Sequence, residues 1–196
     1  MIFIKGGLFT KKATVIADAD YQTETYRKLE AIVAGRLRKK GFRIEYRRIG
    51  RKDLTFCRGC FGCWIKKPGE CVMKDAMEEL NRVCMNSDAV VYLSPVIFGQ
   101  FSANIKNAID RWVPNMLPYF TTRPDGSTIH PPRYEDYPKQ VIIGYGENIS
   151  EEDAQLFVDI TKKHRTNVEC LVMEGSGENI AGVLDSVKLE RIGGSL

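Results

Sequence analysis

Apolar residues along the chain follow two spacings that alternate from one end of the sequence to the other. Short runs rich in β-branched residues, such as Ala13 to Ala17 (ATVIA), are typical of strands buried in a parallel sheet. Stretches with an apolar residue every three or four positions are typical of helices. The predicted strands are 13–17, 42–49, 89–93, 140–143 and 168–173, and the predicted helices are 24–40, 75–84, 102–113 and 150–160. This alternation predicts an α/β fold with a doubly wound parallel sheet.

Residue types at the helix ends support these boundaries. Asp75 followed by Glu78 predicts a capping box at the start of one helix. Ser102 is the expected cap of the next helix, which Pro114 should end, and Ser150 is the expected cap of the last one.

Three loops follow predicted strands, at 18–25, 94–100 and 144–150. Ligands of doubly wound sheets bind beyond the carboxyl ends of the strands, so these loops are expected to meet at one edge and form a binding site. The stretch from 114 to 138 is rich in proline and has little periodicity, which predicts a lid or a contact segment.

Length and composition indicate one ordinary globular domain over residues 1–196. With 43% hydrophobic and 28% charged residues, the sequence excludes disorder, collagen and coiled coil. No apolar run is long enough to span a membrane, and the opening MIFIKGGLFTKK does not resemble a secretory signal, so a cytoplasmic location is expected. The net charge of +4 and the basic stretch 36–52, which lacks interleaved aromatic residues, favour a solvated face over a nucleic-acid site.

Six cysteines are more than such a protein needs, and their placement is uneven. Cys84 and Cys170 lie in apolar stripes and are predicted to belong to the core. The other four form the pattern C-x2-C-x2-C-x7-C within a cysteine-rich loop at 56–72. Thiolates at this spacing can turn toward one centre, as zinc and iron–sulfur clusters require. Buried packing or redox thiols without a metal remain the alternative.

The cysteine motif, CxGCxxCW followed by PGxC, precedes a strand that ends in SPVIFGQFSANIKNAIDR. Together they resemble the NAD(P)H-dependent FMN reductases and iron-sulfur flavoproteins, over about Thr14 to Met173. The resemblance implies a flavodoxin-like fold with a five-stranded parallel sheet in the order 2-1-3-4-5, FMN as cofactor and NAD(P)H as co-substrate. It also implies an unidentified electron acceptor, a small molecule or a redox protein, and a homodimer or homotetramer in which the 114–138 segment helps cover a neighbour's flavin.

The same resemblance implies specific site residues. A [4Fe–4S] cluster, with zinc or no metal as alternatives, is expected at Cys57, Cys60, Cys63 and Cys71. The flavin ring is expected beside Ser94, Pro95, Val96, Ile97, Phe98 and Gly99, and along Gly144, Tyr145 and Gly146. The flavin phosphate is expected at Asp20, Gln22, Thr23 and Thr25.

The phosphate loop departs from the family pattern, because Asp18 and Asp20 stand where relatives have neutral or basic residues. A carboxylate about 4 Å from a phosphate costs on the order of 4 kcal/mol at an effective dielectric of 20. Either these side chains point away, or FMN binds weakly, or the chain has lost it. The alternative function is therefore a non-catalytic flavodoxin-like protein whose cysteine loop has a structural, redox-sensing or partner-binding role.

Five further residues receive ordinary structural interpretations. Lys106, Asp110 and Arg111 are kept in the family but are expected to form ion pairs on the surface of a helix. His130 is expected in the lid. His164 is expected to place a favourable charge near a helix C-terminus.

Overall fold

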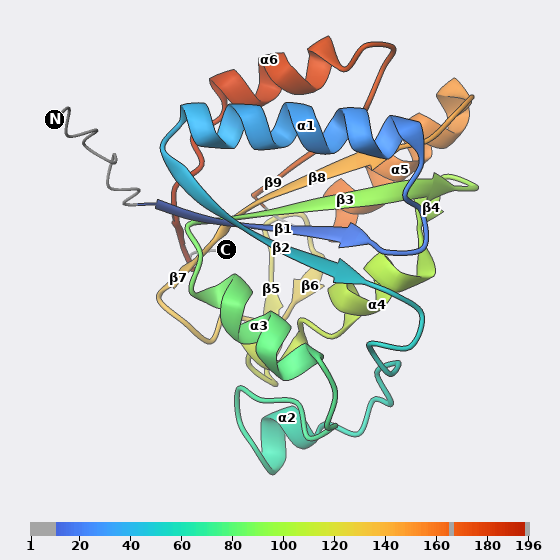
Figure 1. The fold of residues 1–196 in the computed structure, drawn as a ribbon. Coiled ribbons are helices and arrows are strands. Elements are labelled where there is room, and N and C mark those ends of the chain that lie inside the picture. Colours follow the sequence, from blue (N-terminus) through green and yellow to red (C-terminus); the bar gives the residue numbers. More distant parts are fainter. Residues whose placement is uncertain (1–10, 165–166, 195–196) are drawn as a thin grey trace, which may run out of the picture.

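The computed structural model describes residues 11–164 and 167–194, apart from the side chain of His164, and its centre is a parallel sheet (Figure 1). The strands run in the order β2-β1-β3-β8-β9, which is the order 2-1-3-4-5 when these five are counted along the chain. The predicted fold class is therefore confirmed. The strands are β1 (Lys11–Asp18), β2 (Phe42–Ile49), β3 (Ala89–Ile97), β8 (Lys139–Tyr145) and β9 (Val168–Val172).

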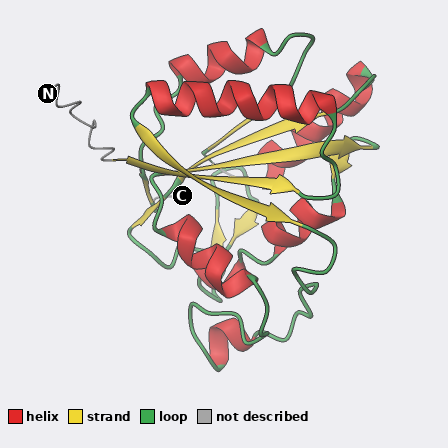
Figure 2. Cartoon of the chain, viewed as in Figure 1, coloured by secondary structure: helices red, strands yellow, loops and turns green. Residues whose placement is uncertain are grey.

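Helices cover both faces of the sheet, as Figure 2 shows. One face packs against α1 (Glu24–Lys39) and α6 (Glu178–Ser186), and the other packs against α3 (Met77–Met85), α4 (Ala103–Asp110) and α5 (Glu151–His164). Both faces of the sheet are buried against apolar side chains, and the strand sequences are therefore nearly continuous apolar runs. Cys84 and Cys170 are buried in one of these cores, as predicted, and burial raises the pKa of Cys170 to about 11.

Strand β3 extends beyond the predicted end at Leu93. Ser94 and Pro95 pair with Gly144 and Tyr145 of β8, and the strand then turns back through β4 (Gln100–Phe101). Pro95 is tolerated because its fixed φ suits extended backbone and it lacks only one donor. The segment expected as a loop is therefore mostly strand, and only its end forms a turn.

Two predicted helix boundaries are wrong. The capping box is absent, because α3 starts after Ala76 without a side-chain cap and the Asp75 carboxylate contacts Thr55 and Arg111. Helix α4 ends at Asp110, and Pro114 lies in a separate short helix, η1 (Val113–Asn115), whose tighter winding accepts a proline in its first turn. The caps at Ser102 and Ser150 are confirmed: each hydroxyl accepts a backbone N–H three residues on.

The 114–138 segment contains the small hairpin β5 (Thr121–Thr122) and β6 (Thr128–Ile129), and β7 (Asp136–Tyr137), which pairs with β10 (Ile192–Gly193). It packs beside α2 (Gly62–Ile65) of the cysteine-rich loop, where the Trp64 indole N–H donates to the Met116 carbonyl at 2.9 Å. His130 lies in this segment, as expected, with its ring 4.8 Å from that of Trp64. Within residues 11–164 and 167–194, none of the helices is both long and apolar enough to cross a membrane.

Candidate functional site

The predicted meeting of three loops at the carboxyl edge of the sheet is confirmed, and Asp18 is its centre. This carboxylate ends β1, is fully buried, and accepts hydrogen bonds from the Ser102 hydroxyl and from the Asn104 amide at 2.9 Å. Ser102 in turn donates its backbone N–H to the Ser94 hydroxyl at 3.2 Å. The ends of β1 and β3 and the start of α4 are thereby joined. Asp18 points into the protein, which is one of the alternatives that the sequence left open.

The third loop is joined to the first by Tyr145. Its buried hydroxyl donates to the Tyr21 carbonyl at 2.9 Å, and burial raises the pKa of Tyr145, so the hydroxyl stays a donor. The Gln22 amide donates to the Asp18 carbonyl at 2.6 Å, and the Thr23 hydroxyl caps α1. The loop after β1 is consequently held in one conformation by its own side chains.

The residues predicted to contact a flavin ring differ in exposure. Ser94, Pro95, Gly144 and Tyr145 are buried in the sheet, and Gly99 is buried in the turn between β3 and β4. Val96, Ile97 and Gly146 are partly buried. Phe98, in contrast, is 88% exposed at the β3–β4 turn and has a left-handed φ of 48°. An aromatic side chain held out to solvent by strained backbone offers a flat surface at the edge.

The N-terminus of α1 carries opposing signals for an anion. Thr23 and Thr25 supply hydroxyls, and the helix dipole favours negative charge. Asp20, however, is exposed beside them and accepts hydrogen bonds from the Asn104 amide at 2.9 Å and the Arg51 backbone N–H at 3.2 Å. Glu24 adds a second carboxylate in the first turn.

Of the four clustered cysteines, Cys63 lies in the short helix α2 and the other three lie on irregular backbone. Cys57 and Cys60 are exposed, whereas Cys63 and Cys71 are partly buried. Burial raises the pKa of Cys63, and the neighbouring thiolates of the other three raise it further. Tight turns with positive φ at Gly59, Phe61 and Gly69 bend this segment.

The donor chemistry of this cysteine set fits a zinc ion or an iron–sulfur cluster. In the described part of the chain, no three cysteine, histidine or carboxylate side chains are already arranged around one point as a metal site. The segment therefore supplies suitable ligands without forming a finished cage.

Arg111 is buried, whereas the sequence predicted a surface residue. Its side chain is 1% exposed, so it is not on the surface, although the Lys106–Asp110 ion pair on the same helix is. One guanidinium nitrogen donates to the Thr55 carbonyl at 3.0 Å and pairs with Asp75, and the other donates to Cys71 Sγ at 3.1 Å.

Both members of the Arg111–Asp75 pair stay charged. Burial alone would raise the pKa of Asp75, but hydrogen bonds from Arg111 and Thr55 hold it well below its usual range. Asp75 thus remains a carboxylate, and Arg111 remains a cation against Cys71. The signal that could have indicated this role was the Asp110-Arg111 pair, which the family resemblance already singled out.

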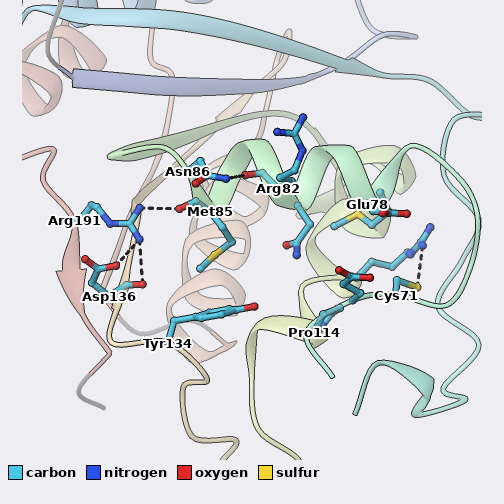
Figure 3. A pocket seen from close by; sticks show the side chains of 14 residues that line it. Cys71, Glu78, Arg82, Met85, Asn86, Pro114, Tyr134, Asp136 and Arg191 are labelled. Atoms are coloured by element: carbon cyan, nitrogen blue, oxygen red, sulfur yellow. Dashed lines mark hydrogen bonds and ion pairs between the residues drawn. The ribbon is translucent and has the colours of Figure 1, made fainter. Parts of the chain in front are cut away.

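A cavity of about 400 Å³ lies between α3 and the 114–138 segment, away from the sheet edge. Figure 3 shows Cys71 at one end of it and the Arg191–Asp136 ion pair at the other. Met85, Pro114 and Tyr134 line its middle. The cavity therefore borders the cysteine site and not the predicted flavin site.

The sheet order, the helix layers and the site at the carboxyl edge define a flavodoxin-like α/β protein. The family model for NADPH-dependent FMN reductases matches residues 21–124, and the chain belongs to that family.

Two curated proteins are similar to part of this chain. An iron-sulfur flavoprotein of Archaeoglobus fulgidus is 43% identical over 83 residues, which are 42% of this chain and 35% of that protein. One from Methanocaldococcus jannaschii is 36% identical over 75 residues, 38% of this chain and 37% of that protein. The matched segment thus spans little more than a third of these curated relatives.

Solved structures agree with the fold. An NAD(P)H:quinone oxidoreductase from Methanothermobacter marburgensis superimposes with a TM-score of 0.65 at 12% identity, covering 89% of this chain and 96% of that one. An azoreductase from Bacillus anthracis gives 0.59 at 15% identity, covering 90% of this chain and all of the other.

Proposed function

We propose that this chain is an FMN-dependent NAD(P)H oxidoreductase, of the flavin reductase or iron-sulfur flavoprotein type, that passes electrons to an acceptor not yet identified. The observation that carries the proposal is the joining of three loops at the carboxyl edge of the sheet in a member of the NADPH-dependent FMN reductase family. Bound FMN would supply hydride acceptance and electron transfer.

The residues at the edge fit a flavin ring better than they fit its phosphate. Phe98 offers an exposed flat surface, and the backbone around Gly99 and Gly146 can approach a ring closely. Thr23 and Thr25 at the start of α1 would hold the phosphate, and Asp20 would oppose it. We therefore expect FMN to bind, but more weakly than it would to a neutral loop.

The cysteine-rich loop is proposed to hold a [4Fe–4S] cluster through Cys57, Cys60, Cys63 and Cys71. Support comes from their donor chemistry, their closeness in the sequence and the similarity to iron-sulfur flavoproteins over the matched segment. Zinc or no metal are the other outcomes that analysis of the purified protein can give.

Residues 1–196 are proposed to act as one domain in the cytoplasm, where thiols stay reduced. We also propose a homodimer or homotetramer in which the 114–138 segment covers a neighbouring site. Tyr119 and Phe120 are largely exposed on this segment, which supports a contact role.

The test is an absorption spectrum and metal analysis of anaerobically purified protein, followed by titration with FMN. Two flavin bands, about four irons per chain and oxidation of NADH or NADPH with an artificial acceptor would support the proposal. Cys60→Ser should remove the iron and leave the flavin. A colourless protein that takes up no added FMN would refute the flavin function.

The second candidate is a non-catalytic relative that has lost FMN and keeps the cysteine loop for structure, redox sensing or a partner. The carboxylates of Asp20 and Glu24 at the phosphate position favour it. Failure to bind FMN by a folded, iron-containing protein would select this candidate.

A further inference from the structure

Arg111 directs one N–H at a cysteine of the cluster motif in addition to forming its buried ion pair. A buried ion pair is costly to desolvate, and replacing such a pair with apolar residues is often neutral or stabilising. Here the pair with Asp75 leaves one arm of the guanidinium directed at Cys71 Sγ, 3.1 Å away (Figure 3). Nε of the same side chain is buried without a hydrogen-bond partner among the described residues, so the arrangement is not the one that best satisfies this arginine.

We propose that Arg111 is a positioning residue that sets the reduction potential of the iron–sulfur cluster held by Cys71. The inference rests on the cluster of the proposed function and goes beyond it by assigning a role to a residue outside the cysteine motif. Asp75 fixes the guanidinium, because its two oxygens also accept the backbone N–H of Thr55 at 2.9 Å and of Met77 at 3.0 Å. The donor to Cys71 is thereby held from two sides.

The direction of the effect follows from charge. Reduction adds one electron to the cluster, with no bond broken and no proton required. The added negative charge spreads onto the ligating sulfurs, and an N–H donor on one of them stabilises the reduced state more than the oxidised state. Asp75 balances the net charge of Arg111, but the Arg111 N–H directed at the sulfur still stabilises the added negative charge. Arg111 therefore raises the potential.

Helix α4 links this contact to the sheet edge. Ser102 caps its start and bonds Asp18, while Arg111 follows its end and bonds Cys71. At about 1.5 Å per residue, these two positions lie on the order of 14 Å apart along one rigid helix. The proposed flavin and cluster sites are thus held at a fixed spacing by the same element.

The experiment is an anaerobic redox titration of the iron-containing protein, followed by electron paramagnetic resonance, on wild type, Arg111→Gln, Arg111→Lys and Lys106→Gln. Arg111→Gln should lower the potential by about 59 mV, which is about a tenfold change in the equilibrium for one electron. Arg111→Lys, which keeps a charged donor, should recover part of the shift. Lys106→Gln removes an exposed cation from the same helix and should leave the potential unchanged.

Each outcome decides the question. A wild-type protein without iron removes the cluster from the proposed function and this inference with it. An intact cluster with the same potential in wild type and Arg111→Gln overturns this inference alone. Loss of iron from Arg111→Gln with unchanged circular dichroism would make Arg111 a residue that retains the cluster and does not set its potential, and would overturn the inference. Unfolding of both variants would make Arg111 a structural residue and overturn the inference.

Discussion

The sheet edge and the cysteine-rich loop are built in opposite ways. At the edge, hydrogen bonds join three loops above two apolar cores, and the Asp18 carboxylate joins the end of β1 to the start of α4. In the cysteine-rich loop, two of the four thiols are exposed, and the tie to the rest of the fold at Cys71 is the buried Arg111–Asp75 pair. The edge is fixed by several hydrogen bonds between neighbouring loops, whereas the cysteine-rich loop is held at Cys71 by this ion pair and at Trp64 by hydrogen bonds to the Val113 and Met116 carbonyls.

This difference indicates how substitutions should affect the site at the sheet edge and the site in the cysteine-rich loop. A site at the edge inherits its geometry from the strands, so substitutions there are expected to change affinity or stability locally. In the cysteine-rich loop the position of Cys71 depends on the Arg111–Asp75 pair, so a substitution in that pair should loosen this part of the site.

The largest effect is expected for Asp75→Asn. Removing one partner of a buried ion pair leaves an uncompensated charge, and about 3 kcal/mol of unfolding free energy should be lost at pH 7. Glu79→Gln, which removes an exposed carboxylate from α3, is the matched control and should leave the unfolding free energy nearly unchanged. Urea unfolding measures both, and hydrogen exchange should increase in residues 56–76 of Asp75→Asn.

The pH dependence of the same variant has a definite sign. Folding lowers the pKa of Asp75. The ionised side chain therefore contributes to the unfolding free energy above its unfolded pKa of about 4, and this contribution is lost as the pH falls through its pKa in the folded protein. The difference in unfolding free energy between wild type and Asp75→Asn should thus stay constant from about pH 7 to 5 and become smaller below about pH 4. A gap that widens in acid would contradict the ion pair.

The same contrast explains what the sequence could predict. The sheet was predictable because apolar runs such as Ala89 to Leu93 record burial on both faces, and the order of strands follows from the family resemblance. The buried contact of Arg111 could not be predicted, because its partner Asp75 lies 36 residues earlier and such a contact leaves no periodic pattern in the sequence. Pro95 misled the prediction of β3, since proline usually ends a strand but here only removes one donor.

The next effect concerns the edge. Ser102→Ala removes both the α4 cap and the hydrogen bond to the buried Asp18 carboxylate, and should cost about 2.5 kcal/mol. Ser150→Ala removes only a cap, that of α5, and should cost about 1 kcal/mol. Equal costs in thermal or urea unfolding would mean that the Asp18 contact adds nothing to the edge.

A smaller effect separates packing from backbone strain in the β3–β4 turn. Gly99 has a φ of 68°, and an added Cβ would lie 2.6 Å from Leu156 Cδ2. Gly126 has a φ of 82° with nothing within 4 Å of such a Cβ. Gly126→Ala should cost about 1 kcal/mol from strain alone, and Gly99→Ala about 2 kcal/mol from strain and crowding. If the two variants unfold at the same urea concentration, the edge is less tightly packed than the structure indicates.

The smallest effect tests whether the exposed carboxylate at the edge limits flavin binding. Asp20 is in solvent, so its repulsion of a phosphate about 4 Å away is about 1 kcal/mol, and Asp20→Asn should tighten FMN binding about fivefold. Riboflavin, which lacks the phosphate, should bind wild type and variant equally, and the gain for FMN should shrink at high salt. Asp159→Asn, on α5, makes the same change in net charge and should leave FMN affinity unaltered. Equal gains for FMN and riboflavin would mean that Asp20 acts on the ring or on the loop and not on the phosphate, and the acidic loop would then no longer argue for a chain that has lost its flavin.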